Sequence, residues 1–223
     1  MRTGPPEAVI FDMDGVLADT EPLHGRCFVR AFAHMGIHIE FEDYRRAVTI
    51  GGSPVRDLYL SLGGDPAEWD HVKSVKDQAL KAELADQIGP LPGVRALIDL
   101  LRGSGIRTGL ATSARRRSMQ LVLDRLDMWS CFDAFATKDE VDAEKPDPAV
   151  FLLAASLLRV EPTACVVIED SPRGVLAANR AGMKCVAVPT PSTADGDFST
   201  ADLVVDSLED VSTATLRGLF ADQ

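Results

Sequence analysis

The most informative stretch of this sequence is residues 8–20, which read AVIFDMDGVLADT. The first four residues form an unbroken apolar run, as expected of a strand that helices cover on both faces of a parallel sheet. Two carboxylates, Asp12 and Asp14, follow immediately. Open α/β sheets bind ligands in the crevice beyond the carboxyl ends of their strands, so this strand predicts a candidate site directly after it.

Similar apolar runs recur along the chain and alternate with helical patterns; CVVIE at 165–169 and CVAV at 185–188 are the clearest. This alternation predicts an α/β fold with a Rossmann-like parallel sheet. The predicted strands are Ala8–Asp12, Arg107–Ala111, Ala134–Thr137, Cys165–Glu169, Lys184–Val188 and Leu203–Val205. The predicted helices between them are Gly93–Arg102, Arg115–Leu126, Pro148–Leu158 and Pro172–Ala181.

The segment between the first two predicted strands contains only helical patterns. A β-α-β crossover needs a single helix, so the additional helices predict an inserted all-helical cap. We assign residues 20–88 to the cap and residues 1–19 and 89–223 to the core, with the sequence GPLPG at 89–93 as the return hinge. The predicted cap helices are Pro22–Met35, Phe41–Val48, Val55–Leu62 and a last one starting at Asp65-Pro66.

The composition is that of a globular protein. Of 223 residues, 46% are hydrophobic and 26% charged, which excludes a disordered or collagen-like chain. With 34 acidic against 23 basic side chains, the formal charge is −11, which argues against binding to nucleic acid. No apolar stretch approaches the roughly 18 residues of a membrane span, and the first one is too short for a signal peptide. We expect a cytoplasmic monomer that binds neither nucleic acid nor membrane.

The four cysteines are widely scattered and form no Cys-x-x-Cys pair. They therefore indicate buried thiols and not a zinc site or a disulfide scaffold. They are Cys27, Cys131, Cys165 and Cys185.

The acidic pair after the first strand has two other interpretations, a solvated acidic turn and a calcium loop. The EF-hand pattern requires a third acidic residue or Asn at Val16 and its glycine one position later than Gly15, so the calcium loop is excluded. By itself, this segment leaves the acidic turn open.

Polar side chains also occur at other predicted strand ends. Thr112 and Ser113 end the second strand just ahead of a helix, whose N-terminal amides attract anions. Lys145 precedes another helix start, while Glu169 and Asp170 end the strand CVVI. Because the carboxyl ends of parallel strands lie at one edge of the sheet, these groups are predicted to meet the two carboxylates of the first strand.

Together these segments resemble the haloacid dehalogenase (HAD) superfamily. The phrases DMDGVLADTEPLH, LPGV, EKPDP and VIEDSPRGVLAANRAGM are similar to the subgroup of sugar-phosphate phosphatases and β-phosphoglucomutase. The resemblance covers nearly the whole chain in the same order. It implies a Rossmann-like core with a helical cap, bound Mg²⁺, and phosphoryl transfer from a small phosphorylated substrate through an aspartyl phosphate.

The resemblance implies a role for each strand-end residue. Asp12 is the implied nucleophile, and Asp14 is the implied general acid and base. Mg²⁺ is implied on Asp12, the backbone carbonyl of Asp14 and Asp170, with Glu169 orienting a metal-bound water.

Phosphate binding is implied for three further residues: Thr112 and the Ser113 amide hold the transferring oxygens, and Lys145 stabilises the charge of the transition state. Weaker substrate candidates are Thr20, His24, Gly51, Gly52, Arg56, Arg115 and Arg116. For the histidine the alternative is packing, and for the arginines at the helix start it is a solvated face.

Three functions compete on this resemblance: a phosphatase, a β-phosphoglucomutase, and a catalytically silent metabolite sensor. A sensor predicts a broken motif, and none is broken; a dehalogenase is disfavoured because it carries no acid/base at Asp14. The resembling mutases have a Lys immediately before the cap-loop glycine and an Arg three positions after it. Here Ile50 and Pro54 occupy those places, and Arg56 is shifted by two residues. We therefore predict a phosphatase of a small sugar phosphate.

Overall fold

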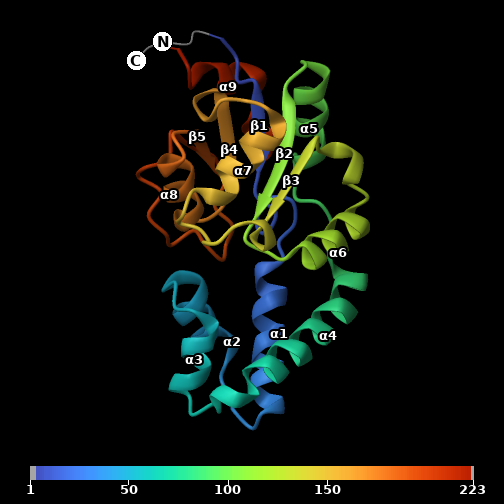
Figure 1. The fold of residues 1–223 in the computed structure, drawn as a ribbon, viewed down its shortest axis with the longest axis vertical. Coiled ribbons are helices and arrows are strands. Elements are labelled where there is room, and N and C mark those ends of the chain that lie inside the picture. The colour runs from blue at the N-terminus through green and yellow to red at the C-terminus, as the bar shows by residue number, and fades with distance from the viewer. Residues whose placement is uncertain (1–3, 222–223) are drawn as a thin grey trace.

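The computed structural model describes residues 4–221, apart from the side chains of residues 84–87. Its centre is a parallel sheet of six strands in the order β3-β2-β1-β4-β5-β6 (Figure 1). The predicted fold class is confirmed. The strands are β1 (Ala8–Phe11), β2 (Arg107–Thr112), β3 (Ala134–Thr137), β4 (Cys165–Glu169), β5 (Lys184–Ala187) and β6 (Leu203–Val204).

Helices cover both faces of the sheet, which explains why the central strands are apolar throughout. Val9 and Phe11 of β1 join one buried cluster, and Ala8 and Ile10 join the other. Each of these four side chains is fully buried, because successive side chains of a strand point to opposite faces. The helices of the first face are α5 (Val94–Gly103), α6 (Arg116–Leu126) and α9 (Thr213–Gly218), and those of the second are α7 (Ala149–Leu158) and α8 (Pro172–Arg180).

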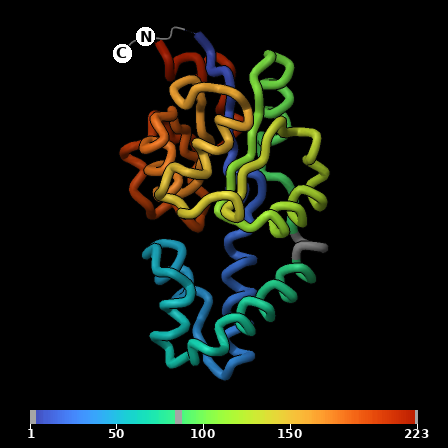
Figure 2. The backbone as a smooth tube through the Cα atoms, viewed as in Figure 1, coloured from blue at the N-terminus to red at the C-terminus, as the bar shows by residue number. Residues whose placement is uncertain are grey.

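The helices between β1 and β2 form a separate body beyond the carboxyl ends of the strands (Figures 1 and 2). They pack around a small cluster of their own, in which Phe32, Tyr59 and Val72 are buried. This independent cluster supports our proposal that residues 20–88 form a cap domain. The cap helices are α1 (Glu21–His34), α2 (Phe41–Tyr44), α3 (Val55–Ser61) and α4 (Trp69–Gln87).

The chain is helical over the predicted range Phe41–Val48, but it is not one regular α-helix. One turn of α-helix, α2, passes into a π-helix over Arg45–Ile50, in which the backbone N–H of Gly51 donates to the carbonyl of Arg46 at 2.9 Å. A wider turn places one extra residue in the helix, and an apolar pattern read at 3.6 residues per turn does not register it.

Two connections join the cap to the core, and a backbone hydrogen bond links them. The N–H of Leu91, in the return connection, donates to the carbonyl of Leu17 at 2.9 Å. Gly93 has a φ of +80°, and a Cβ there would lie 2.5 Å from the backbone nitrogen of Glu209, so only glycine fits at this start of α5.

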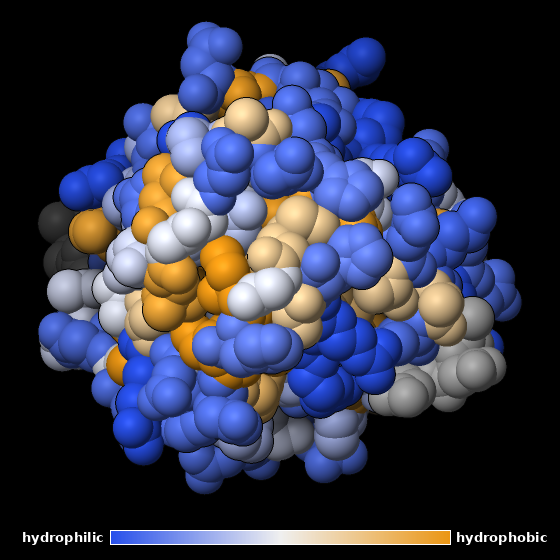
Figure 3. Space-filling model, turned by 90° about the horizontal axis from the view of Figure 1, so that it is seen from below, coloured by the Kyte–Doolittle hydropathy of each residue, from blue (hydrophilic) through white to orange (hydrophobic). Residues whose placement is uncertain are grey.

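Seen from the cap end, apolar side chains gather around a hollow bordered by hydrophilic ones (Figure 3). A hollow of about 550 Å³ in the cap is lined by residues of α1 and α3 and of the segment between α1 and α2.

No helix among the described residues has the length and apolarity needed to cross a membrane. Cys27, Cys165 and Cys185 are buried free thiols as predicted, whereas Cys131 is only half-buried.

Candidate active site

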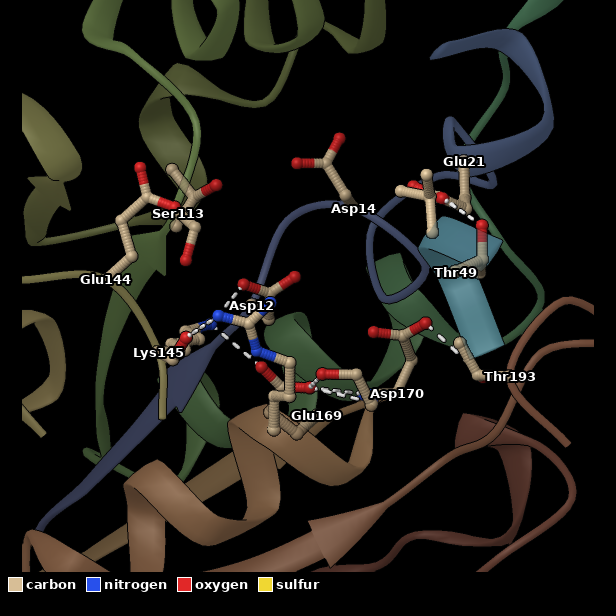
Figure 4. Close-up of a pocket in the computed structure, with 14 residues that line it drawn as sticks. Asp12, Asp14, Glu21, Thr49, Ser113, Glu144, Lys145, Glu169, Asp170 and Thr193 are labelled. Atoms are coloured by element: carbon tan, nitrogen blue, oxygen red, sulfur yellow. Dashed lines mark hydrogen bonds and ion pairs between the residues drawn. The ribbon is translucent and has the colours of Figure 1, made fainter. Parts of the chain in front are cut away.

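A pocket of about 270 Å³ lies between the carboxyl ends of the central strands and the cap (Figure 4). After β1 the chain adds β2 and then β3 on one side of that strand, and later adds β4 and β5 on its other side. The pocket therefore lies at the switch point of the sheet, where diverging loops leave a crevice. It is lined by Asp12, Asp14, Glu21, Val48, Thr49, Thr112, Ser113, Glu144, Lys145, Glu169, Asp170, Ser171, Arg173 and Thr193.

The loop after β1 is shaped by Gly15. Its φ is +82°, and a Cβ at this position would lie 2.2 Å from Oδ2 of Asp170. Glycine thus permits both the left-handed turn and the close approach of a second carboxylate. On the cap side of this loop, the Thr20 hydroxyl donates a hydrogen bond to the Asp14 carboxylate and orients it.

Lys145 sits at the bottom of the pocket between two buried carboxylates. Its Nζ lies 2.5 Å from Oδ1 of Asp12, 2.8 Å from Oε1 of Glu169, and 4.4 Å from the centre of the Phe151 ring. Burial alone would lower the pKa of Lys145, but the two carboxylates outweigh it and raise the pKa above its usual value. The lysine is therefore a permanent positive charge at the floor of the site.

Glu169 is held rigidly by hydrogen bonds from the turn that follows it. Its Oε2 accepts from the N–H of Asp170 at 2.9 Å and from the N–H and hydroxyl of Ser171 at 2.8 and 2.9 Å. A Cβ on Gly174 would overlap the Glu169 carboxylate, so the first turn of α8 also depends on glycine. These contacts hold the Glu169 carboxylate in the position from which it pairs with Lys145.

The pocket carries an excess of buried negative charge. Burial, together with the nearby carboxylates of Glu169 and Asp14, raises the pKa of Asp12 to about 8 against the opposing effect of Lys145. The pKa of Asp170 also lies well above its usual value, chiefly because of burial and then because of Glu169 and Asp12. Oxygen donors that are short of positive charge fit a hard divalent cation, which would keep both carboxylates ionised.

No three Asp, Glu, His or Cys side chains of the described residues are grouped as a metal site. A cation here would thus rest on two side chains, Asp12 and Asp170, and take its remaining ligands from backbone, water or substrate oxygens. Such a coordination shell is usual for Mg²⁺, which retains several waters.

Thr112 shapes the opposite wall of the pocket. It is fully buried, and its Oγ1 accepts from the N–H of Ala114 at 2.9 Å, which tightens the turn between β2 and α6. Ser113, on this turn, faces the cavity.

The structure thus brings together all seven residues predicted at the strand ends. The weaker candidates do not line the pocket within the described ranges; these are Thr20, His24, Gly51, Gly52, Arg56, Arg115 and Arg116. Thr20 contacts the site through its hydrogen bond to Asp14. Arg56 and Arg115 are exposed, and Arg116 pairs with Glu140.

His24 lies half-buried on α1 and is not among the described residues that line the pocket. Burial and the nearby Lys76 ammonium lower its pKa to about 4, although Asp14 and Asp77 act in the opposite direction. We expect the imidazole to be neutral throughout the physiological range. An NMR titration of the histidine C2 protons should show one signal with a midpoint near pH 4. That signal should be missing from the spectrum of the His24→Asn variant. A midpoint near 6.5 for that residue would contradict this expectation.

Several lining residues escaped the sequence analysis. From the cap come Glu21, Val48 and Thr49, and the Thr49 hydroxyl donates to Oε1 of Glu21 at 2.6 Å. Thr49 lies in the π-helix, so no regular pattern could have placed it at the pocket. Glu21 follows directly on the first motif, which is the one signal that could have identified it.

The core adds four more such residues. Arg173 lies in the first turn of α8, Ser171 follows Asp170, Glu144 precedes the lysine, and Thr193 lies 3.5 Å from the Asp170 carboxylate. The first three lie within a few residues of a predicted motif, so their position along the chain was a usable signal, whereas Thr193 lies far from any motif in the sequence.

Comparison with known proteins agrees with this geometry. A family model described as haloacid dehalogenase-like hydrolase matches residues 9–188. Protein CbbY of Rhodobacter capsulatus is 34% identical, covering 96% of this chain and 98% of that protein. Hexitol phosphatase B of Escherichia coli strain K12 is 33% identical, covering 95% and 96%.

A solved structure of similar form is that of CbbY from Rhodobacter sphaeroides in complex with phosphate. It superimposes with a TM-score of 0.83 at 32% identity, covering 92% of this chain and 96% of that one. The family model, the relatives and the structure all agree with the resemblance carried by the strand-end motifs. This chain belongs to the family of haloacid dehalogenase-like hydrolases.

Proposed function

We propose that this enzyme is a Mg²⁺-dependent phosphatase that hydrolyses a small sugar phosphate through a phosphoryl group carried on Asp12. The observation that carries the proposal is the buried Asp12 carboxylate, held by Lys145 at the switch point of the sheet, with Asp14 two residues further on. The names of two relatives, a hexitol phosphatase and a protein crystallised with phosphate, support the same reaction.

The chain's own residues account for each half of the reaction. An oxygen of Asp12 attacks phosphorus, the bond to the sugar oxygen breaks, and Asp14 delivers a proton to that oxygen. Asp14 then removes a proton from water, which attacks phosphorus and releases inorganic phosphate while regenerating Asp12. A bound Mg²⁺ would neutralise charge on the phosphate so that an anionic carboxylate can approach it.

Charge on the transferring group needs fixed donors. Lys145 supplies a positive charge within reach of Asp12, and the turn of Thr112 and Ser113 offers backbone and hydroxyl donors from the opposite wall. Preorganised donors of this kind stabilise the transition state because they need no reorganisation when the charge develops. This is the role we propose for the three residues.

The cap side of the pocket suits hydroxyl groups better than a second phosphate. Glu21 and Thr49 meet the cavity there, and Glu144 adds another carboxylate on the core side. Carboxylates accept hydrogen bonds from sugar hydroxyls and repel phosphate. Arg56 is exposed and does not line the pocket in the part of the chain that the structure describes, which favours hydrolysis over the mutase reaction.

A screen of sugar phosphates with Mg²⁺ tests this proposal. We expect release of inorganic phosphate that stops on chelation and returns with added Mg²⁺, whereas Ca²⁺ should substitute poorly because its larger, looser shell spoils in-line geometry. β-Glucose 1-phosphate with a trace of glucose 1,6-bisphosphate tests the mutase alternative. Glucose 6-phosphate forming much faster than inorganic phosphate would overturn the assignment, and binding of sugar phosphates without any turnover would indicate a silent sensor.

A further inference from the structure

The backbone that carries Lys145 is anchored from outside its own loop. Prolines at positions 146 and 148 have no N–H to donate, and the N–H of Asp147 is used within the turn, on the carbonyl of Glu144 at 3.0 Å. The carbonyls of Lys145 and Pro146 are the groups by which a neighbouring element holds this segment.

Two arginines of α8 bind these consecutive carbonyls. Nη2 of Arg173 donates to the Lys145 carbonyl at 2.5 Å, and Nη1 of Arg180 donates to the Pro146 carbonyl at 2.9 Å. The two arginines are seven residues apart, about two helical turns, so they lie on the same face of α8.

Helix α8 is well suited to act as the support. Its N-terminus is capped by Ser171, whose hydroxyl accepts from the N–H of Gly174 at 3.1 Å, and its inner face is buried against the sheet. Ser171 also binds Glu169, the carboxylate that pairs with Lys145. One helix therefore fixes both the backbone of the lysine and one of its two ionic partners.

We propose that Arg173 and Arg180 are positioning residues that hold the Nζ of Lys145 at the attacking carboxylate. The inference rests on the proposed function, in which Lys145 acts during phosphoryl transfer. Arg173 also lines the pocket and can meet the substrate directly. Arg180 does not line it within the described residues, and its contact with this segment is through the Pro146 carbonyl.

Arg180→Gln is the informative variant, because the shorter side chain cannot reach the carbonyl and no pocket group is removed. We expect kcat to fall roughly tenfold, since displacing a catalytic group by about 1 Å can cost on the order of a hundredfold. KM should stay within about twofold, because the substrate's own contacts remain. Arg180→Lys, which keeps a donor, should recover most of the lost rate.

Arg125→Gln is the matched control. It removes the same charge from the last turn of another helix, α6, where the side chain is exposed and is not among the described residues that line the pocket. Its kcat and KM should equal those of the wild type. Equal kinetics for Arg180→Gln and Arg125→Gln would overturn the inference, and so would a raised KM with unchanged kcat.

A crystal structure of Arg180→Gln gives a readout that does not depend on turnover. We expect Nζ of Lys145 to move away from Asp12 in the variant, and an unmoved Nζ would overturn the inference. If the wild type hydrolyses no phosphate in the screen, the proposed function fails, and the position of Nζ still decides whether the arginines hold the lysine.

Discussion

Replacing Asp12 by asparagine is expected to abolish turnover while the protein remains folded. Asparagine has nearly the shape of aspartate, so the change opens no cavity, but an amide oxygen cannot form the phosphoryl intermediate or hold a cation as a carboxylate does. Loss of a covalent nucleophile should lower kcat by a factor on the order of 10⁴ or more. Steady-state kinetics on the best substrate of the screen measures this loss, and circular dichroism checks the fold.

Asp99→Asn provides the control for this variant. It makes the same chemical change on the exposed face of α5, away from the pocket, and should leave kcat unaltered. If Asp12→Asn kept even a tenth of the wild-type rate, attack by this carboxylate would be the wrong mechanism, whatever the substrate.

Replacing Lys145 by methionine is expected to damage both activity and stability. The variant leaves the buried carboxylates of Asp12 and Glu169 without their shared cation. Removing one partner of a buried ion pair typically costs about 3–5 kcal/mol in the free energy of unfolding. The loss of a preorganised charge at the transferring phosphoryl group should lower kcat by roughly 10²–10³.

The stability loss should be largest at a pH above the pKa of Asp12 and below that of a free lysine. Because the two carboxylates raise the folded-state pKa of Lys145, its charge contributes fully below the ordinary lysine pKa and is lost only as pH rises through the raised value. The pair with Asp12 also requires that carboxylate to be ionised, and its pKa is raised to about 8. Urea unfolding at about pH 9 with chelator present measures the effect without a metal contribution.

Lys73→Met offers a comparison on the surface. Its Nζ pairs with Asp70 at 2.6 Å, but both groups are exposed, so its removal should cost no more than about 1 kcal/mol. If Lys145→Met were no less stable than Lys73→Met, the buried pairs would contribute nothing to the fold.

Most of the core could be predicted from the sequence because its signals are local. An unbroken apolar run such as the one ending at Phe11 indicates a strand buried on both faces, and the fold places it at the centre of the sheet. In a parallel sheet every such strand ends at the same edge. The polar residues at the ends of β1, β2 and β4 were therefore expected to meet, and they do.

The cap was harder to predict because its contribution to the pocket depends on packing between helices. The π-helix brings Thr49 to the cavity, while the predicted glycines at 51 and 52 do not line it within the described residues. Arg116 illustrates the same limit on the core side. Its charge could have served a substrate, but the fold places Glu140 beside it.

The sequence by itself determined the α/β class, the helical insert and the strand-end residues, since hydrophobic periodicity and turn chemistry act over a few neighbouring positions. Only the tertiary structure decided which charged side chains lie next to one another in the site. Lys145 reaches Asp12 across 133 residues of chain, and its carbonyl is bound by Arg173, 28 residues further along. Such contacts depend on how strands are ordered and how α8 packs on them, and the free energy of those arrangements comes from burial throughout the molecule.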